Sequence, residues 1–294
     1  MEIFGIPIQA FLGQLLLGLV NGSFYAMLSL GLAVIFGLLG IVNFAHGALY
    51  MMGAYVAWIG LNSFGINYWF ALIVAPVVIG ALGVVIERLL LRHLYRVDPI
   101  YGLLLTFGLA LIAEGIFREK FGVSGQSYDV PELLQGATNL GFMVLPNYRG
   151  WVIVASLTVC LGTWFVIERT RLGAYLRAGT ENPRLVQAFG VNVPMLVMLT
   201  YAGGAGLAAI AGVLAAPVIQ VQPLMGSNLI IIVFAVVVIG GMGSILGSIL
   251  TGLVLGLVEG LTKVFYPEAS NIVVFVIMAI VLMIRPAGLF GKEK

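Results

Sequence analysis

Two long stretches without charged side chains constrain this sequence more than any other feature. No Asp, Glu, Lys or Arg occurs in the 84 residues between Glu2 and Glu87, or in the 74 residues between Arg184 and Glu259. A helix that crosses a bilayer needs about 20 apolar residues, so each stretch can hold about three. Only 9% of the chain is charged, whereas soluble domains contain about 25% charged residues. The sequence predicts an all-α, polytopic transmembrane bundle and excludes a soluble fold.

The apolar runs predict nine membrane spans in one transmembrane domain that covers residues 1–294, with eight or ten spans as the alternatives. The expected ranges are 11–39, 44–62, 68–87, 100–117, 150–168, 194–218, 227–243, 245–264 and 270–285. The first range is too long for one plain span, so it either tilts or breaks near Gly22. Residues 227–264 hold either two spans or one span with a re-entrant piece. Runs that are apolar throughout do not fit porin-type strands, which alternate apolar and polar positions.

The placement of Lys and Arg predicts the orientation, because cytoplasmic loops are enriched in both. Ten of the 14 basic residues fall on one side and predict a cytoplasmic C-terminus: Arg88, Arg92, Arg96, Arg169, Arg171, Arg177, Arg184, Arg285, Lys292 and Lys294. The opposite side holds Arg118, Lys120, Arg149 and Lys263. Nine spans put the N-terminus outside, and ten put it inside. The polar segment 118–149 is expected to be an external loop, and 169–193 a cytoplasmic one.

Small residues recur at steps of four in two apolar segments. One set is Gly204, Ala208, Gly212 and Ala216, and the other is Gly240, Ser244, Ser248, Gly252, Gly256 and Gly260. This spacing puts each set on one helix face, where small side chains let helices approach closely. The pattern fits ordinary packing within one subunit, which we favour, or smooth faces that slide during gating.

The ionisable groups in the spans lie near helix ends. Glu114 precedes Arg118 by four residues, as Glu259 precedes Lys263, and both spacings suit helical ion pairs. Ion pairs at the membrane interface are favoured over a proton relay, which argues against a proton-coupled carrier. The sequence shows neither charged residues placed to form a ring around a pore nor a carbonyl-filter motif, so an ion channel is not indicated.

Four uncharged or weakly basic polar residues gather near the N-terminus: Asn21, Ser23, Asn43 and His46. A polar side chain in hydrocarbon needs a partner. The cluster is therefore either an internal hydrogen-bond node or the lining of a transport path.

The sequence nominates no catalytic residue, metal site or cofactor of its own. It has no Gly-x-x-x-x-Gly-Lys-Ser/Thr loop for ATP, two histidines and one cysteine, Cys160. The basic residues are accounted for by the inside loops, so a nucleic-acid partner is not expected. A membrane enzyme is a remaining alternative without a nominated nucleophile, base or metal.

The cytoplasmic segment 168–194 predicts a short helix of about two turns across the inner face. Thr180 is the expected N-cap with Glu181 in the first turn, Pro183 is tolerated there, and Gly190 can end the helix in a left-handed conformation. Its other side chains include Arg184, Gln187 and Phe189. Two roles remain open for this helix. It rests on its own bundle or on lipid headgroups, or it docks into a cytoplasmic partner that supplies energy.

Residues 169–217 (RTRLGAYLRAGTENPRLVQAFGVNVP and the span that follows) resemble the cytoplasmic-loop region of permease subunits of branched-chain amino acid ABC importers. Residues 15–55 (with NGSFYAMLSLGLAVIFGLLGIVNFAHG), 237–257 (VVIGGMGSILGSILTGLVLGL) and 284–291 (IRPAGLFG) are similar to the same family. The resemblance covers nearly the whole chain and is greater to the shorter of the two permease types.

The resemblance implies a pore-forming subunit in a bacterial inner membrane, surrounded by lipid and paired with a second, related permease as a heterodimer. Two cytoplasmic ATPases would bind ATP and magnesium, and an external binding protein would deliver the amino acid. The segment from Thr180 to Gly190 would be the coupling helix. The family also includes permeases for urea, amides and other small polar solutes, and a stand-alone secondary carrier is a further alternative.

Overall fold

The protein is described from a computed structural model, which covers residues 2–3, 6–40, 42–95 and 97–291. Arg96, Lys292 and Lys294, three of the ten residues that predict the orientation, lie outside the described residues. The described residues form eleven α-helices: α1 (Ile8–Leu39), α2 (Ala45–Phe64), α3 (Tyr68–Leu89), α4 (Pro99–Phe121), α5 (Asn147–Arg169), α6 (Arg171–Glu181), α7 (Pro183–Ala188), α8 (Val193–Ala215), α9 (Met225–Gly240), α10 (Ile245–Phe265) and α11 (Val273–Ile284).

Short elements complete the described chain. The strands are β1 (Glu2–Ile3) with β2 (Ile6–Pro7), and β3 (Ala137–Asn139) with β4 (Val144–Pro146), each pair antiparallel. The 3₁₀ turns are η1 (Leu91–His93), η2 (Glu132–Leu134) and η3 (Pro267–Ala269). They lie at the ends of the bundle, and Leu91 of η1 joins a small buried cluster with Ile35 of α1 and Tyr201 of α8.

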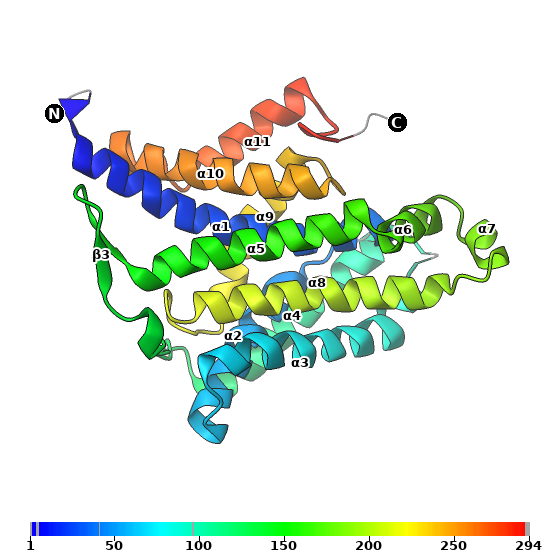
Figure 1. The fold of residues 1–294 in the computed structure, drawn as a ribbon. Helices are drawn as coiled ribbons and strands as arrows, with labels where there is room; N and C mark the ends of the chain where they lie inside the picture. The colour runs from blue at the N-terminus through cyan, green and yellow to red at the C-terminus, as the bar shows by residue number, and fades with distance from the viewer. Residues whose placement is uncertain (1, 4–5, 41, 96, 292–294) are drawn as a thin grey trace.

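The long helices alternate in direction along one bundle axis (Figure 1). α1 begins at the end that carries the β3–β4 hairpin, called here the β3 end. α11 runs toward the opposite end, which carries α6 and α7 and is called the α7 end. The described members of the ten-residue basic set lie at or near the α7 end. The other four basic residues lie toward the β3 end. The two groups of basic residues that were used to predict the orientation therefore lie at opposite ends of the bundle.

Each of the nine predicted spans contains a helix. Six helices (α1, α3 with η1, α4, α5, α8 and α10) are long and apolar enough to cross a membrane. α9 and α11 are shorter, with 16 and 12 residues. α1 runs for 32 residues without interruption, so the break near Gly22 that the sequence left open does not occur. Residues 227–264 form two helices rather than one span with a re-entrant piece.

α1 crosses α10 through glycines on both helices. Gly18 and Gly22 of α1 lie against Gly252, Gly256 and Gly260 of α10, so close that a Cβ atom on any of them would collide with the backbone opposite. Close approach of this kind is what small residues permit in membrane bundles. The small face of α10 is therefore used for packing inside this chain.

α8 packs through the other small-residue face. Gly204 lies against Ile35 of α1, and Gly212 touches the backbone at Tyr50 of α2. Ala208, between the two glycines, is fully buried. α8 thereby joins α1 to α2 in the centre of the bundle.

The set from Gly240 to Gly260 does not lie on one helix, which corrects the prediction for its first two members. Gly240 is the last residue of α9, and Ser244 is the N-cap of α10, where its side chain accepts a hydrogen bond from the amide of Gly247. Gly241 and Gly243 between them have φ of 97° and 87°. This left-handed conformation cannot continue a right-handed helix. Ser248 is the first member of the set on the α10 face.

α3, α4 and α5 cover the outside of the bundle and expose large apolar side chains, for example Ile73, Val77, Leu104 and Phe165. The described structure is thus a helical bundle with an apolar exterior and a tightly packed centre.

Candidate functional site

The helical chain is interrupted inside the bundle between α1 and α2. The imidazole Nε2 of His46, in the first turn of α2, lies 3.1 Å from the carbonyl oxygen of Leu28. Leu28 lies three turns before the end of α1, so α2 begins within the bundle rather than at its surface. The amide of Phe44 donates a hydrogen bond to Thr106 Oγ1 on α4 (3.1 Å). Non-helical backbone at this depth is tolerated only where protein supplies such partners.

Asn43 is the centre of a buried polar node at this interruption. Its Oδ1 accepts a hydrogen bond from the amide of Ala45 (3.1 Å), and its Nδ2 donates to the hydroxyl of Tyr201 on α8 (3.2 Å). Asn43 and His46 are both almost completely buried. The hydrogen bond of His46 to Leu28 requires the proton on Nε2, and Nδ1 finds no hydrogen-bond partner among the described residues. The node joins α1, α2 and α8.

The other two predicted lining residues lie elsewhere. Ser23 is fully buried, and its hydroxyl donates to the carbonyl of Leu19 in its own helix (2.8 Å). Asn21 is half-buried and borders a cavity near the β3 end. The structure does not bring the four residues Asn21, Ser23, Asn43 and His46 into one site. That they line a transport path stays a prediction.

A cavity of about 290 Å³ lies between α2, α4 and α9, and is called here the α2–α4–α9 cavity. Its wall is mainly apolar and includes the rings of Phe44 and Phe107, which meet edge to face at 6.1 Å. Gly47 and Gly226 bring the first turns of α2 and α9 into backbone contact beside it. The cavity therefore combines an aromatic wall with the helix start that follows the interruption.

Glu114 is the acidic residue in the wall of this cavity. Its carboxylate accepts a hydrogen bond from Ser227 on α9 (2.5 Å). The predicted ion pair with Arg118 is not formed, because the side chain of Glu114 is held toward α9 instead. The spacing of four residues allowed the pair, but the contact between α4 and α9 could not be read from one helix alone.

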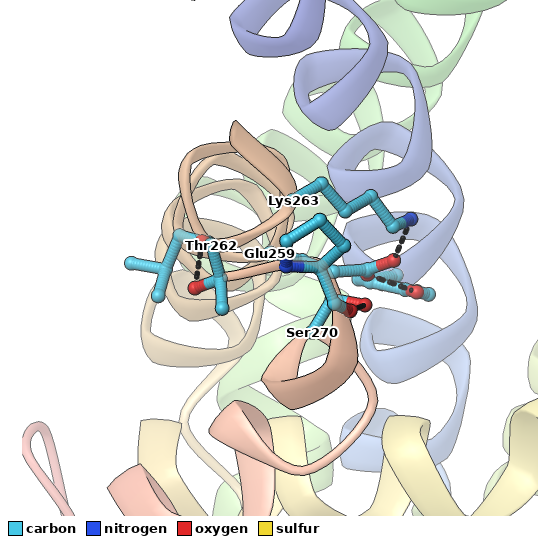
Figure 2. A network of polar contacts seen from close by, with 7 residues as sticks. Glu259, Thr262, Lys263 and Ser270 are labelled. Carbon is cyan, nitrogen blue, oxygen red and sulfur yellow. Dashed lines mark hydrogen bonds and ion pairs between the residues drawn. The ribbon is translucent and has the colours of Figure 1, made fainter. Parts of the chain in front are cut away.

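The second predicted ion pair, Glu259 with Lys263, is formed on α10 (Figure 2). The buried Glu259 carboxylate also accepts a hydrogen bond from the hydroxyl of Tyr25 on α1 (2.6 Å). Lys263 and Arg149 border the cavity that Asn21 lines, which has a volume of about 290 Å³. The network fixes α10 against α1 near the β3 end.

The predicted cytoplasmic helix exists, but its N-cap is not Thr180. α6 continues through Thr180 to Glu181, and Asn182 caps α7 by accepting a hydrogen bond from the amide of Leu185 (3.1 Å). The hydroxyl of Thr180 donates instead to the carbonyl of Arg177 (2.7 Å). Asn is a strong N-cap and precedes a proline that suits the first helical position. The Asn-Pro pair was the sequence signal for this boundary.

α7 turns one apolar side chain toward the bundle and leaves two exposed. Val186 is buried, whereas Leu185 and Phe189 are 54% and 78% exposed. Arg184 and Gln187 are exposed as well. Gly190 follows with φ of 83°, the left-handed conformation that the sequence predicted. The helix is six residues long, which is close to the two turns expected.

A groove of about 880 Å³ separates α7 and the start of α8 from the end of α3. Thr180, Pro183 and Gln187 line one side of it, and Glu87 and Tyr95 line the other. The Tyr95 hydroxyl donates to Glu87 (2.9 Å), and burial together with this carboxylate raises the pKa of Tyr95. Tyr95 thus stays protonated as a donor at neutral pH.

Comparison with known proteins places the chain in a family. Residues 14–282 match the family model described as the branched-chain amino acid transport system permease component. The chain is 31% identical to the high-affinity branched-chain amino acid transport system permease protein BraD of Pseudomonas aeruginosa, over 98% of both chains. It is 28% identical to LivH of Escherichia coli K12, a permease of the same description, over 97% of this chain and 96% of LivH. Identity to LivM of the same organism is 26%, over 92% of this chain and 68% of LivM. No solved structure matches.

The bundle, its apolar exterior and its glycine-packed centre define a polytopic helical membrane protein of the permease class. The match along nearly its whole length shows that the chain belongs to the branched-chain amino acid transport permease family.

Proposed function

We propose that this chain is a pore-forming permease subunit of an ATP-driven importer for branched-chain or other neutral amino acids, which moves its substrate by alternating access. The family match supports the substrate class, since BraD and LivH are named as branched-chain amino acid permeases. The chain is also similar to LivM, which supports pairing with a second, related permease. An external binding protein would deliver the amino acid to this pair.

Two cytoplasmic ATPases, which would bind ATP and magnesium, are proposed to contact α7. The observation that carries this proposal is the exposure of Leu185 on α7 and of Phe189 at its C-cap, at the basic end of the bundle. Large apolar side chains clustered on an exposed polar segment are typical of a protein contact. Arg184, exposed beside them, would meet acidic or polar groups of the ATPase. The α7 end, with the C-terminus, would therefore be cytoplasmic.

The proposal is tested by reversing the charge of Arg184 in the complete transporter. Reconstituted with both permeases, the ATPases and the binding protein, Arg184→Glu should abolish ATP-dependent leucine uptake while the permease still inserts into the membrane. Arg171→Glu in α6, a basic residue that is also exposed at the same end, is the matched control and should transport. Normal uptake by Arg184→Glu would remove α7 as the coupling element.

A second variant tests the end of the helix. Gly190 has a φ of 83° and its amide donates to the carbonyl of Gln187 (2.9 Å). Proline permits neither feature, so Gly190→Pro should also abolish uptake with insertion intact. Leucine uptake driven by an ion gradient in vesicles that contain this chain alone would contradict the ATP-driven mechanism.

A further inference from the structure

Glu114 is a carboxylate within a membrane-spanning helix, and it is only partly buried by its own chain. Among the described residues no Lys, Arg or His forms an ion pair with it. Ionisable groups within spans almost always face a bundle interior or a water-filled path, and they mark substrate routes. The α4 face that carries Glu114 is therefore unsuited to contact with lipid tails.

We propose that the α2–α4–α9 cavity is a passage site for the substrate, in which Glu114 binds the ammonium group of an aliphatic amino acid. This proposal rests on the proposed function of the chain and adds the residues that would hold the substrate. The apolar wall would take the branched side chain, and Glu114 would set its orientation.

The chemistry of the cavity fits such a substrate. Its volume of about 290 Å³ lies at the lower end of ligand pockets, which start at about 300 Å³. Phe44, Met51, Phe107 and Ile230 provide apolar surface, which a branched aliphatic side chain would contact without loss of hydrogen bonds. A larger or strongly polar solute would not match this wall.

The carboxylate of Glu114 has capacity for a further partner. Ser227 donates one hydrogen bond to it, while an ionised carboxylate has about four acceptor positions and an ammonium has three donors. The ion pair would form in a water-poor setting, where such hydrogen bonds are stronger than between exposed groups. Glu114 can therefore hold α4 to α9 and bind an ammonium at the same time.

The mouth of the cavity opens on the side of the chain. Phe107, Leu111 and Ile231 at this mouth are about half exposed. In the proposed pair of permeases, the second subunit would close this side and leave a passage between the two. The site thus predicts which face of the bundle meets the second permease.

The test is leucine uptake by the reconstituted complete transporter with Glu114→Gln. Glutamine keeps an acceptor for Ser227 but loses the charge, so a purely structural role would survive the change. We expect kcat/KM for leucine to fall at least about tenfold, the loss that one charged hydrogen bond implies. The matched control is Glu119→Gln, an exposed residue of the same helix outside the cavity, which should behave as wild type.

The outcomes separate this proposal from the proposed function. If the wild-type complex imports leucine with ATP and Glu114→Gln matches Glu119→Gln, the cavity proposal is wrong and the function stands. If the wild-type complex imports neither a branched-chain nor another neutral amino acid with ATP, the proposed function itself fails.

A second measurement decides the question if Glu114→Gln does not assemble. The single native cysteine, Cys160, is buried, so Ala110→Cys in the cavity wall supplies a specific probe. In the assembled complex a water-soluble thiol reagent should modify it, and leucine supplied through the binding protein during turnover should slow the modification. Modification by a membrane-soluble reagent alone, or a rate unaffected by leucine, would overturn the proposal.

Discussion

Gly256 lies at the point where α10 crosses α1, with the backbone of Gly22 directly opposite. A valine there must push the two helices apart, because the atoms that its Cβ meets belong to the backbone and cannot rotate away. We expect Gly256→Val to destabilise the bundle by about 3 kcal/mol or more and to lower its melting temperature in detergent.

The control for this substitution is Gly162→Val on α5. Gly162 has open space where its Cβ would be placed, and valine in a helix costs less than about 1 kcal/mol. The melting temperature of Gly162→Val should stay near that of wild type. Equal losses in the two variants would contradict the close crossing of α1 and α10.

The two ion pairs of the described structure differ in burial, and so should their contributions to stability. Lys263→Met leaves the buried Glu259 carboxylate with Tyr25 as its remaining partner, which should cost about 1–3 kcal/mol. Arg177→Met breaks an exposed pair with Glu168 and should cost less than about 1 kcal/mol. Melting temperatures of both variants in the same detergent compare the two effects, and a larger loss for Arg177→Met would contradict the burial of Glu259.

At the scale of the element, α7 depends on its cap. Asn182→Ala removes the acceptor for the Leu185 amide and should destabilise the helix by about 1 kcal/mol. Hydrogen exchange at Leu185 should then speed up. Thr180→Ala removes a hydroxyl that bonds within α6, so exchange at Leu185 should not change. Faster exchange in Thr180→Ala alone would restore Thr180 as the cap.

The sequence could predict those features of a helix that depend on residues within or next to that helix. The helix ranges follow from uninterrupted apolar runs, and the left-handed Gly190 follows from its place after a short helix. The cap was assigned to the wrong residue because Thr180 and Asn182 both suit the position. The continuation of α6 to Glu181 decided between them.

The partner of Glu114 depended on a contact between separate elements. Its spacing to Arg118 suggested a pair on α4, whereas Ser227 lies 113 residues away in sequence. Tyr201 and Thr106 were missed in the same way, since their roles exist only once α4 and α8 surround the interruption before α2. Patterns within one segment predicted helices and small-residue faces, but not which helices meet.

At the scale of the whole molecule, the two ends of the bundle should be accessible from opposite sides of the membrane. Thr138 on β3 is exposed at one end, and Phe189 is exposed at the other. A membrane-impermeant thiol reagent added to intact cells should label Thr138→Cys and not Phe189→Cys. Lysis should make Phe189→Cys reactive, while buried Cys160 gives little background. Labelling of Phe189→Cys in intact cells would reverse the orientation.

The crossing of α1 with α10 also has a consequence for biosynthesis. α1 leaves the ribosome before the other described helices, yet the helix that covers its glycine face is made more than 200 residues later, as the 234-residue separation of Tyr25 and Glu259 shows. Contacts so distant in sequence form slowly, and incomplete chains expose the surfaces that await them. Until α10 is inserted, the glycine face of α1 has no native neighbour. A chain that stops before α10 would therefore leave this face of α1 uncovered and open to recognition by membrane quality control.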